Sequence, residues 1–372
     1  MSMATLSSQH SPGLWTLAWR RLRVDRVAML SLAVVLLFLL TLVLSATELI
    51  AADWEVEVGV NYAPPSFVGA QSASERGMTE APATTAETPP ENPYDPLKDV
   101  IRQLRAEMAN SAAPSVTNDY GIPDPLEKEL TEIRSNQSTT SVSLEKQETL
   151  PLGADKWGHD IIKKTIKGAE TSIIVGLVSA LLATVLGTLF GALSGYFGGW
   201  IDDCFNWFYS IFTSIPYLLL ILAVAAVLQQ KGVTTIILIL GLTGWTGVFR
   251  LIRAEYMKHK EREYVLAADA IGASHWRKMF VHIFPNVSHV ALVQMSILVV
   301  GFIKSEVILS FLGFGVPVGV VSWGSMLNEA QNELILGKWW QLTAATVAMA
   351  VLVTAFSLFT DALRDALDPK LK

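Results

Sequence analysis

The sequence predicts an all-α polytopic membrane protein with six transmembrane helices and a large external insertion between the first and the second. Hydrophobic residues make up 51% of the 372 residues and charged residues only 17%, and the mean hydropathy is +0.40. Soluble domains carry about a quarter charged residues. The apolar residues also gather into long runs, as spans of about 20 helical residues require. Composition and patterning therefore both indicate a membrane protein.

The first predicted span is residues 27–47, whose stretch 27–44 contains no charged residue. Basic residues favour the cytoplasmic side of a membrane, and four arginines precede this span without a matching cluster behind it: Arg20, Arg21, Arg23 and Arg26. Residues 1–26 are therefore predicted to be a cytoplasmic segment. A cleaved signal peptide is the alternative, but the apolar run is longer than the hydrophobic region of such a peptide.

Residues 48–168 are predicted to form an external, acidic and partly disordered insertion. They hold 20 acidic and 11 basic residues, so more than half of the 34 acidic residues lie in this block. Its middle, residues 69–93, is rich in Ala, Ser, Thr, Glu and Pro, which predicts disorder. Residues 54–62 alternate as in a short strand, and residues 95–110 and 124–135 have helical spacing.

Five further apolar runs predict a five-helix core within residues 169–366. They lie at residues 172–193, 211–228, 233–252, 287–312 and 342–359. Pro216 interrupts the run 211–228, the third predicted span, and predicts a kink, because proline lacks the N–H donor that a helix requires. Six spans place both ends of the chain on one side, so the tail 367–372 is also expected in the cytoplasm.

The loop 253–286, between the fourth and fifth spans, falls on the cytoplasmic side in this topology. Its basic residues satisfy the same charge rule independently. A short predicted helix within it is crowded with small residues, namely Ala267, Ala268, Ala270, Gly272 and Ala273. Such side chains are too small to fill a core, but they let another backbone approach closely. The loop is therefore expected to be a docking surface.

The same loop resembles the EAA loop of ABC-transporter inner-membrane permeases. The matching positions are Ala267, Ala268, Gly272, Pro285 and Asn286. The chain departs from this pattern at Leu266, where the family has Glu, and at Phe284, where it has Leu.

Other sequence segments resemble the C-type permease subunit of the dipeptide, oligopeptide and nickel importer branch. They are LGADKWGHDIIKKTIKGAETSIIVG (152–176), SGYFGGWIDD (194–203), SIPYLLL (214–220), LSFLGFGV (309–316), SWGSML (322–327) and DALRDALDPK (361–370). This resemblance covers most of residues 151–372 and implies the type I ABC importer permease fold.

The resemblance also implies a function and a set of partners. The chain would be a permease subunit of an ATP-driven importer in the bacterial inner membrane and would form half of a translocation path for peptides. Its partners would be a second, distinct permease, two ATPase subunits that bind ATP and Mg²⁺, a periplasmic substrate-binding protein and membrane lipid, with no nucleic acid. Nickel or another small solute is the alternative cargo, and an ATPase-independent secondary transporter or a membrane-anchored scaffold is the alternative class.

By the same resemblance, ATPase coupling would depend on residues of the short helix and the turn after it. These are Glu263, Ala267, Ala268, Asp269, Ala270, Gly272, Ala273 and Ser274, with Pro285 and Asn286 closing the loop.

No enzymatic activity is predicted for the chain. The sequence contains no GxxxxGK[ST] phosphate-binding loop, so no cofactor is expected and ATP hydrolysis would belong to partner subunits. The single cysteine, Cys204, cannot form an internal disulfide or a multi-thiolate site. His159, His275, His282 and His289 lack the spacing of metal ligands on one helix face. Neither a catalytic residue nor a metal site is therefore predicted.

Two kinds of residue in the apolar runs need a separate explanation. Glu306 lies in the apolar run 287–312, the fifth predicted span, where an ionisable group is costly. It is expected either to line the path or brace a subunit interface, or to lie near the external membrane surface. Four tryptophans near the ends of predicted spans are expected to anchor at headgroup level: Trp245, Trp323, Trp339 and Trp340.

Overall fold

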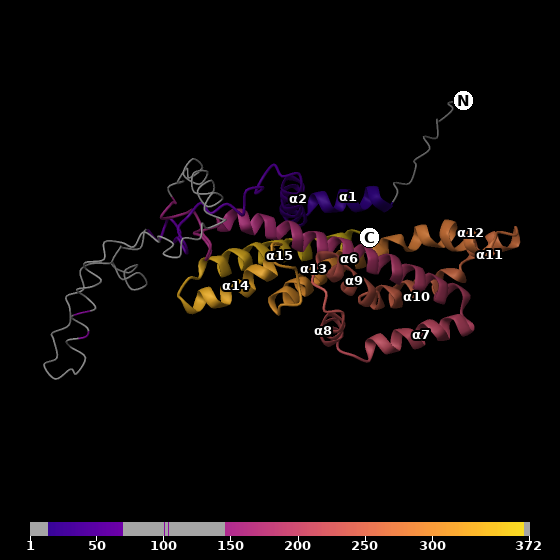
Figure 1. The fold of residues 1–372 in the computed structure, drawn as a ribbon. Helices are drawn as coiled ribbons and strands as arrows, with labels where there is room; N and C mark the ends of the chain where they lie inside the picture. Colours follow the sequence, from indigo (N-terminus) through magenta and orange to yellow (C-terminus); the bar gives the residue numbers. More distant parts are fainter. Residues whose placement is uncertain (1–13, 70–99, 101–102, 104–145, 368–372) are drawn as a thin grey trace, which may run out of the picture. The chain divides into compact units, whose positions relative to one another are not determined.

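A computed structural model describes residues 14–69, 100, 103 and 146–367 (Figure 1). The chain divides into two compact units, residues 1–68 with 147–372 and residues 69–146, and the elements below belong to the first. The predictions of disorder in residues 70–93 and of helices in 95–110 and 124–135 concern segments that, apart from residues 100 and 103, lie outside the described residues. The same holds for most of the predicted tail.

The described part of the first unit is helical. Its helices are α1 (Leu14–Val24), α2 (Arg26–Ala46), α6 (Ile161–Phe197), α7 (Gly199–Thr213), α8 (Tyr217–Leu228), α9 (Val233–Thr243), α10 (Thr246–Lys260), α11 (Glu263–Ala270), α12 (His275–Arg277), the π-helical turn η1 (Lys278–Ile283), α13 (Phe284–Phe311), α14 (Trp323–Ile335) and α15 (Trp340–Leu367).

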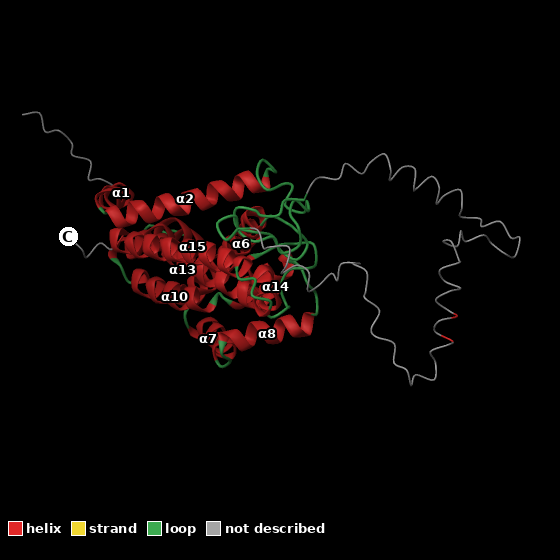
Figure 2. Cartoon of the chain, turned by 90° about the vertical axis from the view of Figure 1, so that its left-hand side faces the viewer, coloured by secondary structure: helices red, strands yellow, loops and turns green. Residues whose placement is uncertain are grey.

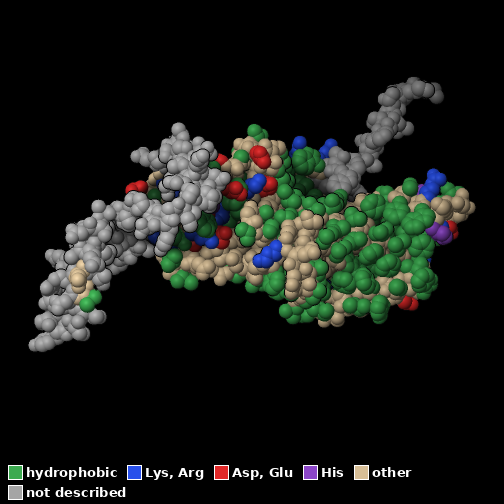
Figure 3. Space-filling model, in the orientation of Figure 1, with side chains coloured by type: hydrophobic (Ala, Val, Ile, Leu, Met, Phe, Trp, Pro, Cys, Tyr) green, Lys and Arg blue, Asp and Glu red, His purple; other side chains and the backbone are tan. Residues whose placement is uncertain are grey.

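Within the described residues, five stretches of helix are long and apolar enough to cross a membrane. They are α2, α6, α9 with α10, the stretch from α12 to α13, and α15. A sixth span exists only if α7 and α8 count as one, although they meet at an angle of 85°. Figure 3 shows hydrophobic side chains over most of the visible face, with charged side chains mainly toward its ends. The prediction of an all-α polytopic membrane protein is confirmed.

The third predicted span, residues 211–228, is not one continuous helix. Helix α7 ends at Thr213 and α8 begins at Tyr217, so the break lies around Pro216, whose ring and missing N–H oppose continuation of a helix. Helix α8 has 12 residues, or about 18 Å of length, and cannot by itself cross a hydrocarbon layer of about 30 Å. The expected kink is thus a complete break.

Helix α6 is the centre of the packing, with α9, α10 and α13 against it. Three of its glycines, each four residues from the next, let α10 approach closely. A Cβ atom at Gly187 would lie 2.6 Å from the Cβ of Val248, and one at Gly195 would lie 2.5 Å from the carbonyl oxygen of Arg253. Small residues at this spacing are typical of tightly packed membrane helices. Figure 2 shows α2 along one side of this body and α7 with α8 along the opposite side.

Residues 54–62 do not form the predicted strand. Only isolated β-bridges occur there, among them Glu57 with His159 and Gly59 with Gln147. The backbone amides pair instead with the loop before α6; for example, the amide of Gly59 donates to Gly158 O at 3.0 Å and that of Tyr62 to Asp155 O at 2.9 Å. The backbone amides of this alternating segment are therefore paired with another loop and not with a neighbouring strand of a sheet.

The expectation that the four tryptophans anchor at headgroup level is wrong for three of them. Trp245, Trp323 and Trp340 are at most 5% exposed, whereas Trp339 is 39% exposed. The indole of Trp323 donates to Thr165 O at 3.1 Å and that of Trp340 to Ala154 O at 2.7 Å. Backbone carbonyls inside the chain accept hydrogen bonds from the indole N–H groups of Trp323 and Trp340. Burial of these two rings therefore loses no hydrogen bond.

Candidate functional site

The docking surface predicted from the small residues is a short helix followed by a tight turn. Helix α11 ends in a pair of backbone hydrogen bonds, from Gly272 N to Asp269 O at 2.9 Å and from Ala273 N to Ala268 O at 3.0 Å. This pairing is a Schellman cap, which requires a left-handed residue just after the helix. Gly272 supplies it with φ +77°, and a Cβ atom there would meet no atom of the chain within 4 Å. The turn therefore needs glycine, and the space around it is open.

The structure brings the predicted coupling residues together but not all onto one surface. Most of them are exposed on α11 and its turn, Ala273 is half-buried, and Ala268 is only 4% exposed. Ala268 therefore faces this chain's own core beside the buried Val265, and it cannot be part of a docking surface in this arrangement. Its small size serves internal packing instead.

The residues expected to close the loop lie in the first turn of α13. Pro285 occupies one of the first helical positions, where its missing N–H costs nothing. The Asn286 amide donates to His282 O at 2.8 Å. Both are exposed, and they lie inside the helical stretch His275–Phe311 that forms the fifth candidate span, so this span begins earlier than the predicted end of the loop.

Large apolar side chains, which the sequence reasoning missed, are exposed around the same turn. Leu266 is 57% exposed, Ile271 85% and Trp276 58%. The Trp276 ring stacks on that of Phe280, with centroids 5.7 Å apart. Exposed apolar groups gathered in this way mark interaction sites. The signal in the sequence was the presence of these residues in a loop otherwise rich in charge.

We call the loop 253–286 the docking loop. Polar contacts hold it against the helical body. Tyr196, near the end of α6, shares a hydrogen bond of 2.9 Å between its hydroxyl and His275 Nδ1. The Tyr256 hydroxyl of α10 donates to Met279 O at 3.2 Å. Lys278 pairs with Asp269, and this hydrogen bond holds the pKa of the Asp269 carboxyl below its usual range. A force on the loop would thus reach α6 and α10 directly.

Helix α7 is attached to the same region. Arg253 of α10, the first residue of the predicted loop 253–286, donates from Nε and Nη2 to the two carboxylate oxygens of Asp202, each at 2.6 Å. Such bidentate pairs are the strong, geometrically specific ones. The Trp245 ring also stacks on Phe208 of α7, with centroids 5.4 Å apart. The first half of the broken span is therefore connected to α10 and, through it, to the docking loop.

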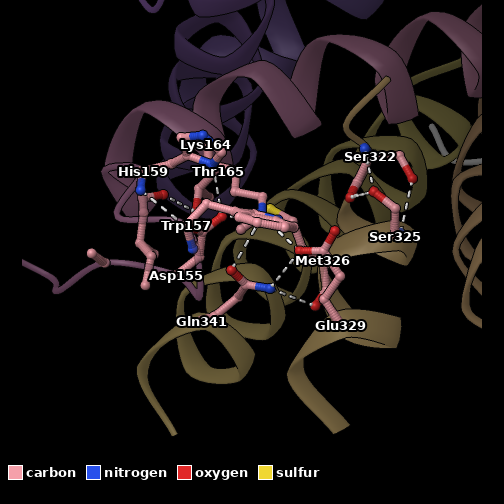
Figure 4. Close-up of polar contacts among 12 residues, drawn as sticks. Asp155, Trp157, His159, Lys164, Thr165, Ser322, Ser325, Met326, Glu329 and Gln341 are labelled. Atoms are coloured by element: carbon pink, nitrogen blue, oxygen red, sulfur yellow. Dashed lines mark hydrogen bonds and ion pairs between the residues drawn. The ribbon is translucent and has the colours of Figure 1, made fainter. Parts of the chain in front are cut away.

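At the opposite end of the body, residues far apart in the sequence form a buried polar network (Figure 4). Lys164 donates to Asp155 Oδ2 at 2.7 Å and to Glu329 Oε2 at 2.6 Å. The side chains of Lys164 and Asp155 are 3% and 0% exposed. Gln341 donates to Glu329 Oε2 at 3.2 Å and to Met326 O at 3.1 Å. We call this set, together with Glu333, the α14 cluster; sequence reasoning did not find it.

Burial and neighbouring charges together set the pKa values of the α14 cluster. Burial alone would raise the pKa of the Asp155 carboxyl, but the charge and hydrogen bond of Lys164, with the backbone amide of His159, outweigh burial and hold that pKa below its usual range. Glu333 is 1% exposed, and its carboxylate oxygens accept no hydrogen bond of normal geometry from the described residues. Burial raises the pKa of Glu333 to about 7; Lys164 opposes this shift and Asp155 and Glu329 add to it.

Replacing Glu333 with glutamine is expected to stabilise the protein at pH 8 and to change little at pH 5. A carboxyl whose pKa is raised from 4.5 to about 7 on folding stabilises the fold fully below the lower value. This contribution is lost as the pH rises through the higher one. The difference corresponds to about 2–3 kcal/mol between the two pH values. Thermal unfolding at both pH values measures it, with the exposed Glu55→Gln as control; parallel curves for the two variants would contradict the assignment.

Glu306 is completely buried inside the chain, five residues before the end of α13. Its carboxylate accepts from Ser172 Oγ and from Ser310 Oγ, each at 2.7 Å, and Ser172 Oγ in turn accepts from Trp323 N at 3.2 Å. With 0% exposure, Glu306 lines no open path or partner interface in this structure, and its position near the external membrane surface stays a prediction. It joins α6, α13 and the start of α14.

Replacing Glu306 with alanine is therefore expected to lower the free energy of unfolding by about 2 kcal/mol, because two buried serine hydroxyls lose their acceptor. Glu306→Gln keeps an acceptor oxygen and is expected to have less than half that effect. Thermal unfolding of the purified subunit complex compares the two variants. Equal loss in both would show that the negative charge, and not the hydrogen bonding, is what the fold requires.

Comparison with known proteins agrees with this architecture. Residues 187–372 match the family described as the binding-protein-dependent transport system inner membrane component, and residues 13–65 match the N-terminal TM domain of oligopeptide transport permease C. A methionine ABC transporter, MetNI, in an inward-facing form covers 56% of this chain and 98% of its own, with a TM-score of 0.44 and 16% identity.

Three relatives are similar in sequence. The dipeptide transport system permease protein DppC of Bacillus subtilis is 36% identical over 232 residues, which are 61% of this chain and 72% of that protein. The oligopeptide transport system permease protein OppC of the same organism is 37% identical, over 59% and 72%. DppC of Lactococcus lactis is 28% identical over 95% of this chain and 90% of that protein. With its helical membrane-spanning body and these matches, the chain belongs to the family of inner-membrane components of binding-protein-dependent transport systems.

Proposed function

We propose that this chain is a permease subunit of an ATP-driven peptide importer and that it pairs with a second, distinct permease to frame the translocation path. The relatives named for dipeptide and oligopeptide transport support the cargo. The observation that carries the coupling part of the proposal is the turn at Gly272, which is open on its outer side and surrounded by the exposed apolar residues Leu266, Ile271 and Trp276.

In this proposal the importer has two ATPase subunits, which bind ATP and Mg²⁺, and one of them docks on that surface. The chain needs no cofactor of its own and catalyses no covalent step. Closure of the ATPases would move α11, and the hydrogen bonds of Tyr196 and Tyr256 would transmit the movement to α6 and α10. Through the Asp202–Arg253 pair the movement would also reach α7. Alternating access then follows from the different contacts that the permease pair makes in its two states.

The proposal also sets an orientation in the bacterial inner membrane. The docking loop, residues 1–26 and the tail 367–372 lie in the cytoplasm, as the arginines before α2 favour. The α14 cluster and residues 48–168 lie on the periplasmic side. A substrate-binding protein would deliver the peptide to this side.

The decisive experiment is reconstitution of the tagged chain with the subunits that co-purify with it. ATPase subunits are expected in the complex, and the proteoliposomes should import a labelled dipeptide only when ATP is present on the docking-loop side. Uptake that proceeds without any nucleotide-binding subunit would overturn the ATP-driven mechanism. Import of Ni²⁺ but not of peptides would overturn the cargo alone.

A further inference from the structure

A cavity of about 660 Å³ lies at the end of the body that carries the α14 cluster. Its lining comes from the loop after α2, the start of α6 with the segment before it, the loop before α9, the end of α13 with the loop after it, and helix α14. Ligand pockets in proteins have volumes of about 300–1,000 Å³. The cavity is therefore large enough for a small ligand, and it is built from segments that are distant in the sequence.

One ion pair in the lining already belongs to the fold. Lys164 Nζ donates to Glu329 Oε2 at 2.6 Å, and the side chain of Lys164 is 3% exposed (Figure 4). Lys164 also pairs with Asp155 at 2.7 Å. The charges of these side chains are thus engaged with one another and are not available to a ligand. Recognition of a ligand's charge must come from other residues of the lining.

The three other charged side chains of the lining are not engaged in this way. Glu55 and Lys231 are exposed, and neither side chain forms a hydrogen bond or an ion pair with another described residue. The Lys156 ammonium lies 5.4 Å from the centroid of the Trp157 ring and pairs with no carboxylate of the described residues. The cavity therefore offers a ligand one free carboxylate and two free ammonium groups, from three different loops.

The same cavity has an apolar wall, which residues 316–321 form together with the Trp157 ring. Val318 is 102% exposed and Trp157 is 55% exposed. Val318 precedes Gly319, whose φ of +88° is readily adopted only by glycine. Exposed apolar groups gathered in one place mark interaction sites. This wall is therefore expected to contact an apolar part of the ligand.

We propose that this cavity receives a short peptide with both termini free on its way to the translocation path. The terminal carboxylate pairs with the ammonium groups of Lys231 and Lys156, and the terminal ammonium pairs with Glu55. The side chains of the peptide lie against residues 316–321. This inference rests on the proposed import of peptides and deepens it, because it places a recognition site for the cargo in the permease itself.

The free charges favour a zwitterion over a ligand with charge of one sign. An inorganic anion would be attracted by Lys156 and Lys231 but repelled by Glu55, and a metal cation would meet the reverse. A peptide with free ends carries both charges, separated by about 3.3–3.6 Å per residue when it is extended. It can therefore give each free group of the cavity a partner of opposite sign, whereas amidation of its C-terminus would leave the two lysines without one.

The test is photo-crosslinking of the tripeptide alanine–photo-leucine–alanine to the assembled importer and its substrate-binding protein in proteoliposomes. The probe is used with a free C-terminus and as the C-terminal amide. In the wild type the free peptide is expected to label residues 316–321 or Trp157, as mapped by mass spectrometry, and to label them more strongly than the amide does. Lys231→Gln should lower this preference about fivefold, as expected for a partly exposed ion pair, and should leave labelling by the amide unchanged. Any preference of the binding protein is the same for both variants and cancels in the ratio.

The matched controls are Glu48→Gln, an exposed glutamate outside the cavity, and Lys163→Gln, whose ion pair with Asp53 also lies outside it. Both should keep the wild-type preference. An unchanged preference in Lys231→Gln would overturn the pairing with the carboxylate. Wild-type labelling confined to other parts of this chain or to its partners would overturn the site, even if Lys231→Gln failed to assemble, and continued ATP-driven import of the peptide would leave the proposed function standing. Failure of the wild type to import the peptide would instead overturn the proposed function, and this site with it.

Discussion

Replacing Lys164 with methionine is expected to lower the free energy of unfolding by about 3–5 kcal/mol, the cost of removing one partner from a buried ion pair. Lys164 is 3% exposed and Asp155 is 0% exposed, so the variant leaves a carboxylate in the interior without its cation. Glu329 would lose its 2.6 Å ion pair as well. Thermal or denaturant unfolding of the purified complex measures the loss.

The neighbouring Lys163 provides the matched control. It forms an ion pair of the same length, 2.6 Å, with Asp53, but these side chains are 34% and 57% exposed. Exposed pairs contribute about 0–1 kcal/mol, so Lys163→Met should be nearly neutral. Adding Asp155→Asn to Lys164→Met should recover part of the loss, because the buried charge is removed. Equal losses of unfolding free energy in Lys163→Met and Lys164→Met would show that burial is not the reason why the ion pairs of Lys164 stabilise the fold.

Replacing Gly272 with valine is expected to leave the subunit inserted and assembled yet to reduce ATP-driven peptide uptake by more than tenfold, while ATP hydrolysis continues. The added side chain would occupy the open side of the turn on which the ATPase is proposed to dock. Valine also disfavours the left-handed backbone at φ +77°, at a cost of about 1–2 kcal/mol. Uptake and hydrolysis should be measured on the same proteoliposomes.

Two further variants separate these effects. Gly272→Asn tolerates the left-handed conformation but still adds bulk, so it should uncouple uptake as well. Gly337→Val imposes the same backbone strain, at φ +75° and in open space, in the turn between α14 and α15, and it should leave coupling intact. Normal uptake by Gly272→Asn would assign this glycine to the turn alone and would contradict a docking contact at residue 272.

The membrane class and most spans could be predicted because they depend on local properties. A run such as 27–44 is long and uncharged wherever it lies in the fold, and an apolar helix of that length is stable only in a bilayer. The short helix in the loop 253–286 was predictable for a related reason. Its small residues lie close together in the sequence, and the turn after it closes by hydrogen bonds between neighbours such as Gly272 and Asp269.

The polar interior could not be predicted, because its partners are distant in the sequence. Lys164 meets Glu329 across 165 positions, and Ser172 meets Glu306 across 134. Pairing at such separations leaves no periodic signal. The sequence raised the question of why Glu306 lies in an apolar run, and the packing of α6 against α13 answered it by supplying two buried serine donors.

The sequence by itself determined that this protein is an all-α membrane protein, where its spans lie, which loop carries the small residues and which family it resembles. Only the tertiary structure decided that the third span is broken, that Ala268 faces inward while Leu266 and Ile271 face outward, and that Trp245 and Trp323 are core residues. The reason is physical. The length of an apolar run is a property of one segment. Burial and ion pairing depend on which other segment packs against it, and only the tertiary structure shows that.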